Sequence, residues 1–148
     1  MKEINFNALK DEIFKRLKEL KEVVISTSYK DQVTSRTVYC YLDNDYLHFI
    51  TSKAYTKYRQ ISRNPNVALC SGNMQIEGIA EIMGHPKECE INIDDENTMN
   101  YVNHYGRIKN TVLIRVRPTK VILYKGQGYY QYLHLAEEKA FSKGSVRG

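Results

Sequence analysis

A succession of short strand-like segments constrains the fold of this chain more than any other feature. Between residues 23 and 125, seven runs rich in β-branched and aromatic residues alternate with turn-forming residues. These runs are residues 23–28, 36–42, 46–51, 67–71, 74–83, 111–117 and 120–125. Tight turns such as Asp43-Asn44-Asp45 separate most of them, and tight turns join antiparallel neighbours. The sequence therefore predicts a mainly β fold, an antiparallel barrel or sandwich.

Helices are expected before and between the strands. Apolar residues recur at helical spacing near the N-terminus and predict an amphipathic helix over about residues 7–21. A short connecting helix is expected over residues 54–64, where Asn64-Pro65 ends it, and another in the second half of residues 86–106. The length of 148 residues is that of a single domain spanning residues 1–148, with a tail expected to fray over about residues 139–148.

Composition excludes several classes of protein. Charged residues interrupt every apolar run near the N-terminus, so neither a signal peptide nor a membrane span is expected, and the sequence predicts a soluble, cytoplasmic protein. The three cysteines and four histidines show no metal-ligand spacing, so no metal site is expected. The net charge of +5 suits an anionic partner, either a phosphate-bearing small molecule or a nucleic acid.

Hydroxyl groups and cations gather around the predicted helix at residues 54–64. Thr51 and Ser52 precede this helix, where free backbone N–H groups favour an anion, and Lys57 lies within its first turns. A hairpin through residues 43–45 would bring Arg36 close to Thr51. Two interpretations remain open: a phosphate site, or a capped helix whose lysines are solvated surface charges.

The region around these residues resembles a known family. The stretch "RTVYCYLDNDYLHFITSKAYTKYRQISRNPNVALC" and the later "EGIAEI" are similar to the FMN-binding split barrel of the pyridoxamine 5'-phosphate oxidase-like superfamily, in particular its general stress protein branch. The shared features are an arginine that opens a strand, a Phe-x-Thr strand end, a lysine six residues later, Asn-Pro, and a Gly-x-Ala strand. Their order and spacing, over residues 23–125, carry the resemblance.

The resemblance implies an antiparallel split β-barrel of six to seven strands that forms a homodimer with FMN at the subunit interface. It implies that Arg36 and Lys57 bind the FMN phosphate, and that Thr51 and Ser52 bind the phosphate or the ribityl chain. It further implies three residues beside the flavin: Val38 and Ile50 through their backbone, and one side-chain amide, which is either Asn73 or Gln75.

Two departures from the family pattern bear on activity. Tyr41 and Thr56 occupy positions where the oxidases carry further basic residues, so the phosphate has fewer cationic ligands here. The sequence "GYYQYLHL" replaces the arginine-rich segment that binds pyridoxal phosphate, so oxidation of pyridoxamine phosphate is not expected. The tyrosines of this segment suit either a cover over a ligand or a dimer interface.

Three functions are therefore compatible with the sequence. The first is an FMN-dependent oxidoreductase of unknown substrate, in which the flavin carries the chemistry and no catalytic side chain is assigned. The second is a binding or carrier protein for flavin, a deazaflavin or haem. The third is a nucleic-acid-binding β-barrel, for which strand tyrosines would be stacking surfaces.

Overall fold

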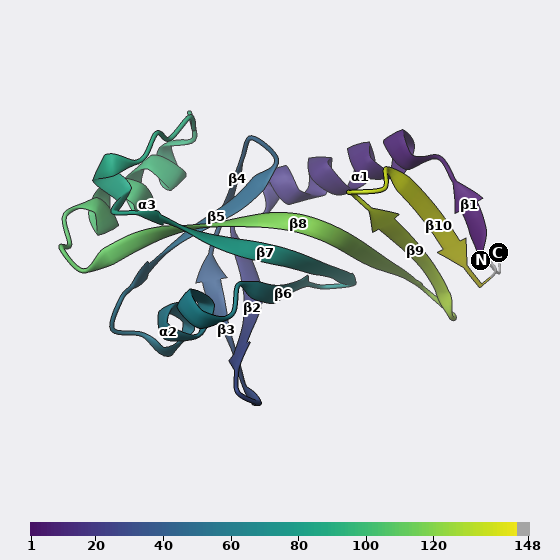
Figure 1. The fold of residues 1–148 in the computed structure, drawn as a ribbon. Helices are drawn as coiled ribbons and strands as arrows, with labels where there is room; N and C mark the ends of the chain where they lie inside the picture. Colours follow the sequence, from purple (N-terminus) through teal and green to yellow (C-terminus); the bar gives the residue numbers. More distant parts are fainter. Residues whose placement is uncertain (145–148) are drawn as a thin grey trace.

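The computed structural model describes residues 1–144, and ten strands of this part form one antiparallel sheet (Figure 1). The strands are β1 (Lys2–Ile4), β2 (Glu22–Tyr29), β3 (Gln32–Tyr39), β4 (Tyr41–Asp43), β5 (Tyr46–Ser52), β6 (Asn66–Ser71), β7 (Met74–Gly84), β8 (Thr111–Gly126), β9 (Tyr129–His134) and β10 (Lys139–Lys143). The helices are α1 (Phe6–Glu19), α2 (Thr56–Arg63) and α3 (Glu96–Gly106), with a 3-10 turn at Pro86–Glu88. The predicted fold class, mainly β with an N-terminal helix and connecting helices, is confirmed.

The sheet curls around β8, its longest strand. Neighbouring strands follow the order β1-β10-β9-β8-β7-β6-β2-β3, and the first half of β8 also pairs with β5, which pairs in turn with β4. The second half of β8 pairs with β9 instead. β3 and β5 approach each other without pairing, so the barrel is split between these two strands.

The N-terminal helix covers the inner face of the β9–β10 extension (Figure 1). The Asn5 side chain caps α1 by accepting a hydrogen bond from the backbone N–H of Ala8 at 2.8 Å. Leu9, Ile13 and Leu17, the predicted apolar stripe, are buried in the main core with residues of the barrel strands. No helix among residues 1–144 is long and apolar enough to cross a bilayer.

Two of the predicted strands are one strand in the structure. Pro118 was expected to end the strand at residues 111–117, but β8 continues through it. Pro118 pairs with Gly78 and Lys120 pairs with Glu77, so Thr119 is the extra residue of a β-bulge. Because the regular hydrogen bonding is interrupted at a bulge, the strand can contain a proline, which has no N–H, at this point. Gly78 is required there, because a Cβ atom would lie 2.7 Å from Val116 Cγ1 and 2.9 Å from the carbonyl oxygen of Arg117.

The prediction of a frayed tail is wrong for its first residues. Lys139–Lys143 forms β10, which pairs with β9 on one side and with β1 on the other. Ala140 and Ser142 of this strand are buried, because they face α1 and the main core. The buried positions of this segment alternate as in a strand, but they hold the small residues Ala140 and Ser142 between Lys139 and Lys143, so the hydrophobic pattern is weak. Residues 145–148 lie outside the described part.

Candidate anion-binding site

Arg36 is held on the inner face of β3. It pairs with Ile25 of β2, which is fully buried, so its side chain shares the face that turns toward the core. The guanidinium donates hydrogen bonds to Thr27 Oγ1 at 2.9 Å, to Thr34 Oγ1, and to the carbonyl oxygen of Ile25 at 3.4 Å. A guanidinium has five N–H donors, so these contacts leave two for a ligand.

A buried amide of α2 orients the two threonines. The Gln60 side chain is 5% exposed, and its Oε1 accepts hydrogen bonds from Thr27 Oγ1 at 2.5 Å and Thr34 Oγ1 at 2.7 Å. Because both hydroxyl hydrogens point at Gln60, both oxygens turn their lone pairs toward Arg36. Gln60 Nε2 also donates to the carbonyl oxygen of Gln32 at 3.2 Å, which ties α2 to β3. The network fixes the guanidinium before any ligand arrives.

Lys57 brings a second positive charge to this place. It lies in the first turn of α2, half-buried, with Nζ 4.7 Å from the centroid of the Tyr55 ring. Burial lowers the pKa of Lys57 below its ordinary value, and the positive charge of Arg36 lowers it further. Burial likewise lowers the pKa of Arg36. The predicted proximity of these two cations is therefore present in the structure.

Neither cation has a counter-ion among residues 1–144. Within residues 1–144, the four ion pairs join other residues, and none includes Arg36 or Lys57. Partly desolvated charges of like sign repel each other, and each loses hydration. An anion placed between the two cations would offset both their mutual repulsion and their loss of hydration. The geometry therefore fits an anionic group such as a phosphate.

Thr51 and Ser52 occupy different positions from those predicted. Both belong to β5, and α2 begins only at Thr56 with Tyr55 as its N-terminal boundary residue, so neither hydroxyl caps the helix. Thr51 is 3% exposed and its Oγ1 is buried with no hydrogen-bond partner in the described residues. Ser52 Oγ accepts from the backbone N–H of Ala54 at 3.1 Å. Thr51 thus offers an unpaired hydroxyl, whereas Ser52 shapes the turn.

The backbone of Ile50 is already occupied. Tyr101 of α3 places its hydroxyl at the free edge of β5, where Oη accepts from the Ile50 N–H at 2.7 Å and donates to the Ile50 carbonyl oxygen at 3.4 Å. The Tyr101 ring also lies 4.3 Å from the ring of Tyr39, the last residue of β3. Val38 is partly buried against the main core. Tyr101 therefore fills the split between β3 and β5 beside Ile50.

The two candidate amides lie elsewhere. Asn73, in the β6–β7 turn, accepts from Arg16 of α1 at 2.6 Å and donates to the carbonyl oxygen of Tyr124 at 2.7 Å. Gln75 is exposed on β7 and pairs with the exposed Cys70, which places it on the outer face of the sheet. Arg36 faces inward, so the structure brings neither amide to the cation pair.

The hairpin predicted between the strand of Arg36 and the strand of Thr51 forms only next to its turn. The predicted pairing farther from the turn is wrong. β4 pairs with β5 only over Tyr41–Asp43, and Arg36 pairs with Ile25 instead of Thr51. The chain changes partner at Cys40, whose N–H donates to the carbonyl oxygen of Lys21 at 2.9 Å. This change of partner opens the split, and α2 rather than strand pairing brings Lys57 to Arg36.

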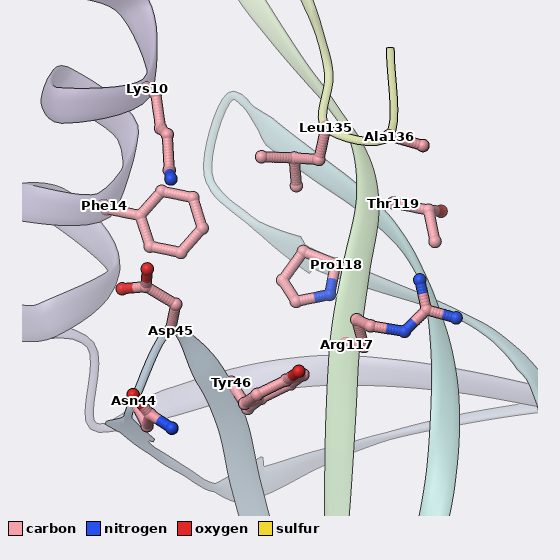
Figure 2. A pocket seen from close by; sticks show the side chains of 10 residues that line it. All are labelled: Lys10, Phe14, Asn44, Asp45, Tyr46, Arg117, Pro118, Thr119, Leu135 and Ala136. Carbon is pink, nitrogen blue, oxygen red and sulfur yellow. The ribbon is translucent and has the colours of Figure 1, made fainter. Parts of the chain in front are cut away.

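A separate pocket lies between α1 and the bulge of β8 (Figure 2). Lys10 and Phe14 of α1 form one wall of this cavity of about 440 Å³, and Arg117 and Pro118 form part of the opposite wall. Figure 2 shows Lys10 and Arg117 on opposite sides, with Asp45 near Lys10. Because the charged groups of this pocket do not converge on one point, the pocket is a weaker candidate for an anion-binding site than the Arg36–Lys57 pair.

The fold is a split antiparallel barrel, and Arg36 and Lys57 place two cations on it without a counter-ion among residues 1–144. The chain belongs to the pyridoxamine 5'-phosphate oxidase family, whose model matches residues 9–125. No curated protein sequence matches it significantly.

Solved structures share the fold at low sequence identity. General stress protein 26 from Bacillus anthracis superposes with a TM-score of 0.63 at 22% identity, over 85% of this chain and 98% of that one. A pyridoxamine 5'-phosphate oxidase-related, FMN-binding protein from Nostoc punctiforme gives 0.61 at 13% identity, over 99% and 100%. The haem storage protein HutZ from Vibrio cholerae gives 0.56 at 12% identity, over 78% and 94%. At these identities, the superpositions show the fold alone.

Proposed function

We propose that the protein is a cytoplasmic FMN-binding oxidoreductase of this family, with the FMN phosphate bound between Arg36 and Lys57. The observation that carries the proposal is the pair of partly buried cations without a counter-ion in the described residues. The buried, unpaired hydroxyl of Thr51 supplies a further donor on the inner face of β5. Among solved structures of this fold, the Nostoc punctiforme protein is described as FMN-binding.

The residues of this chain would bind and orient the cofactor. When bound, FMN would supply hydride and electron transfer, so no side chain is assigned to the chemical step. Arg36, fixed by Thr27, Thr34 and Gln60, would make directed hydrogen bonds to the phosphate. Lys57 would contribute a positive charge from α2. The substrate would differ from pyridoxamine phosphate, because the arginine-rich segment of the oxidases is replaced by a tyrosine-rich one.

We further propose that two copies assemble around the cofactor. Val24 and Val33 are 37% and 69% exposed, and both lie on the outer face of the β2–β3 hairpin, where a second copy would cover them. Light scattering coupled to gel filtration, with and without FMN, tests the assembly. A monomer at every concentration, with FMN bound, would contradict it.

An absorption spectrum of the purified protein, before and after addition of FMN, tests the proposed function. Flavin bands that co-elute with the protein, and that inorganic phosphate displaces, would support the Arg36–Lys57 site. A protein that leaves FMN free but binds haem or a deazaflavin would be a carrier or enzyme for that ligand. Affinity for single-stranded RNA that falls steeply with salt, without flavin binding, would favour the nucleic-acid function.

Flavin reduction separates an enzyme from a carrier. An FMN-loaded sample is mixed anaerobically with NADH or NADPH, and the flavin absorption is followed. Bleaching that air reverses would support an oxidoreductase. A flavin that neither nicotinamide donor reduces, in a protein that binds it tightly, would favour a carrier.

A further inference from the structure

The ring of Tyr101 occupies a place in the split where the backbone of Ile50 offers both a donor and an acceptor. We call this place the Tyr101 slot: it lies between the ring of Tyr39 on β3 and the backbone of Ile50 on β5. The open edge of β5 begins here because β4 pairs with β5 only as far as His48. The Ile50 N–H and carbonyl therefore need a partner from outside the sheet.

Tyr101 interacts with the slot as a planar ligand would. Its ring lies against the Tyr39 ring with a centroid distance of 4.3 Å, and its hydroxyl meets both backbone groups of Ile50. A flavin ring also combines a flat aromatic surface with an edge of donors and acceptors. Both rings cannot occupy the same place. Arg36 faces inward and Tyr39 outward, so a ligand that touches both must extend through the split between β3 and β5. We propose that α3 is a displaceable cover, and that a ligand anchored at Arg36 and Lys57 extends through the split and expels Tyr101 from the slot; this inference rests on the proposed function.

The attachment of α3 to the barrel is light. Its buried contacts form a small cluster of Tyr41, Ile50, Val102 and Leu113, separate from the main core. The Tyr41 hydroxyl is buried there without a hydrogen-bond partner in the described residues, which costs stability in the covered state. Segments with few buried contacts open at a lower free energy than the core. Release of α3 therefore leaves the main core intact.

Polar contacts outside the slot hold α3 in place, among them a hydrogen bond that Thr111 Oγ1 of β8 donates to the carbonyl oxygen of Tyr105 at 3.0 Å. Asp95 caps the helix by accepting from the Thr98 N–H at 2.9 Å, and it forms an ion pair with Lys21 at 3.0 Å. Thr98 Oγ1 also donates to Asp95 at 2.6 Å, so the Tyr39 hydroxyl must donate to Thr98 Oγ1 at 3.0 Å. These contacts can be weakened without changing the slot, which allows a test independent of Tyr101.

The proposal predicts the affinity of specific variants for FMN. If Tyr101 occupies the slot in most molecules, the apparent dissociation constant equals the intrinsic one divided by the small fraction of molecules in which the slot is open. Tyr101→Phe keeps the ring but removes both hydrogen bonds to Ile50, so FMN should bind about five to ten times more tightly. Asp95→Ala should act in the same direction. Tyr105→Phe is the matched control, because Tyr105 lies on the same helix, is 36% exposed and touches Tyr101 only edge-on; its affinity should equal that of the native protein.

Amide exchange followed by NMR provides a readout besides affinity. In the ligand-free protein, the Ile50 amide should be protected by the Tyr101 hydroxyl, and Tyr101→Phe should reduce that protection. Saturation with FMN should remove protection from the amides of α3, whereas inorganic phosphate, too small to reach Ile50, should leave α3 protected. The two ligands share the cation pair, so the difference between them isolates the slot.

The outcomes separate the two proposals. If FMN saturates the protein while α3 stays protected, or if Tyr101→Phe binds FMN no more tightly, the displacement is overturned but the proposed function stands. If neither the native protein nor Tyr101→Phe nor Asp95→Ala binds FMN, the proposed function fails and the inference fails with it. FMN binding that appears only in the variants would support both.

Discussion

Replacement of Lys57 by methionine gives the sharpest test of the cation pair. Methionine keeps most of the apolar stem of lysine, so it preserves the packing of that stem while it removes the charge, including its contact with the Tyr55 ring. The bound phosphate would lose one charge-assisted hydrogen bond, which is worth about 1.5–3 kcal/mol. FMN should therefore bind about 10 to 150 times more weakly, as measured by quenching of flavin fluorescence. Arg36→Ala should weaken binding by a similar factor.

Although Lys57→Met should weaken FMN binding, it should not destabilise the ligand-free protein. Lys57 is partly desolvated and repelled by Arg36, with no compensating carboxylate in the described residues. Lys57→Met should leave the free energy of unfolding unchanged or raise it, by no more than about 1 kcal/mol because the group is half exposed. Urea denaturation measures this change. Loss of FMN affinity together with unchanged or increased stability distinguishes a binding charge from a structural one.

Lys53→Met is the matched control for Lys57→Met. Lys53 lies four residues earlier, is exposed, and its backbone N–H bonds to the carbonyl oxygen of Asn110. The substitution removes the same charge from the same region without touching the pair. If both variants lose FMN affinity equally, only the net charge matters and the assigned contact is refuted. If neither variant loses affinity, the site itself is wrong.

Three further predictions concern the network, the bulge and pH. Gln60→Leu should weaken FMN binding several-fold and lower the free energy of unfolding by about 1–3 kcal/mol, measured by urea denaturation, because two buried hydroxyls lose their acceptor. Gly78→Ala should cost about 1–3 kcal/mol of stability in the same assay, since its Cβ would meet backbone and Val116. The pKa of Lys57 in the folded protein lies below its ordinary value of 10.5. At a pH between these two pKa values, the unfolded chain therefore binds more protons than the folded protein does. Ligand-free stability should therefore rise, and FMN affinity fall, as the pH approaches 10.5; both trends should be weaker in Lys57→Met.

The sequence analysis assigned Arg36 and Lys57 to one anion site, and this assignment stays a prediction. In the structure the charge of Arg36 acts on Lys57, but α2 rather than the predicted hairpin brings the two together. The tight hairpin of β2 and β3, in which Lys30 and Asp31 both adopt positive φ, was not predicted. Lys-Asp is not one of the dipeptides that usually mark such turns, so this turn has no clear signal in the sequence.

The supporting polar residues were missed for a similar reason. Thr27 and Thr34 are ordinary strand residues in the sequence, and Gln60 lies on the predicted helix without any motif around it. Their meaning depends on two elements that meet only in the fold, the β2–β3 hairpin and α2. The signal available in advance was weak: an amide among the apolar residues of a short helix that ends at Asn-Pro.

Tyr101 could not be predicted as part of the site, because its role depends on where β4 ends. Once the barrel splits between β3 and β5, the N–H and carbonyl of Ile50 point into the split, and leaving both without partners would cost several kilocalories per mole. A hydroxyl is the one small group that accepts from an N–H and donates to a carbonyl through a single oxygen. Serine and threonine are too short to reach a strand edge from a neighbouring helix, so tyrosine fits the requirement. A split barrel that leaves this strand edge open therefore needs a group that both donates and accepts, and under the displacement proposed above that group competes with FMN.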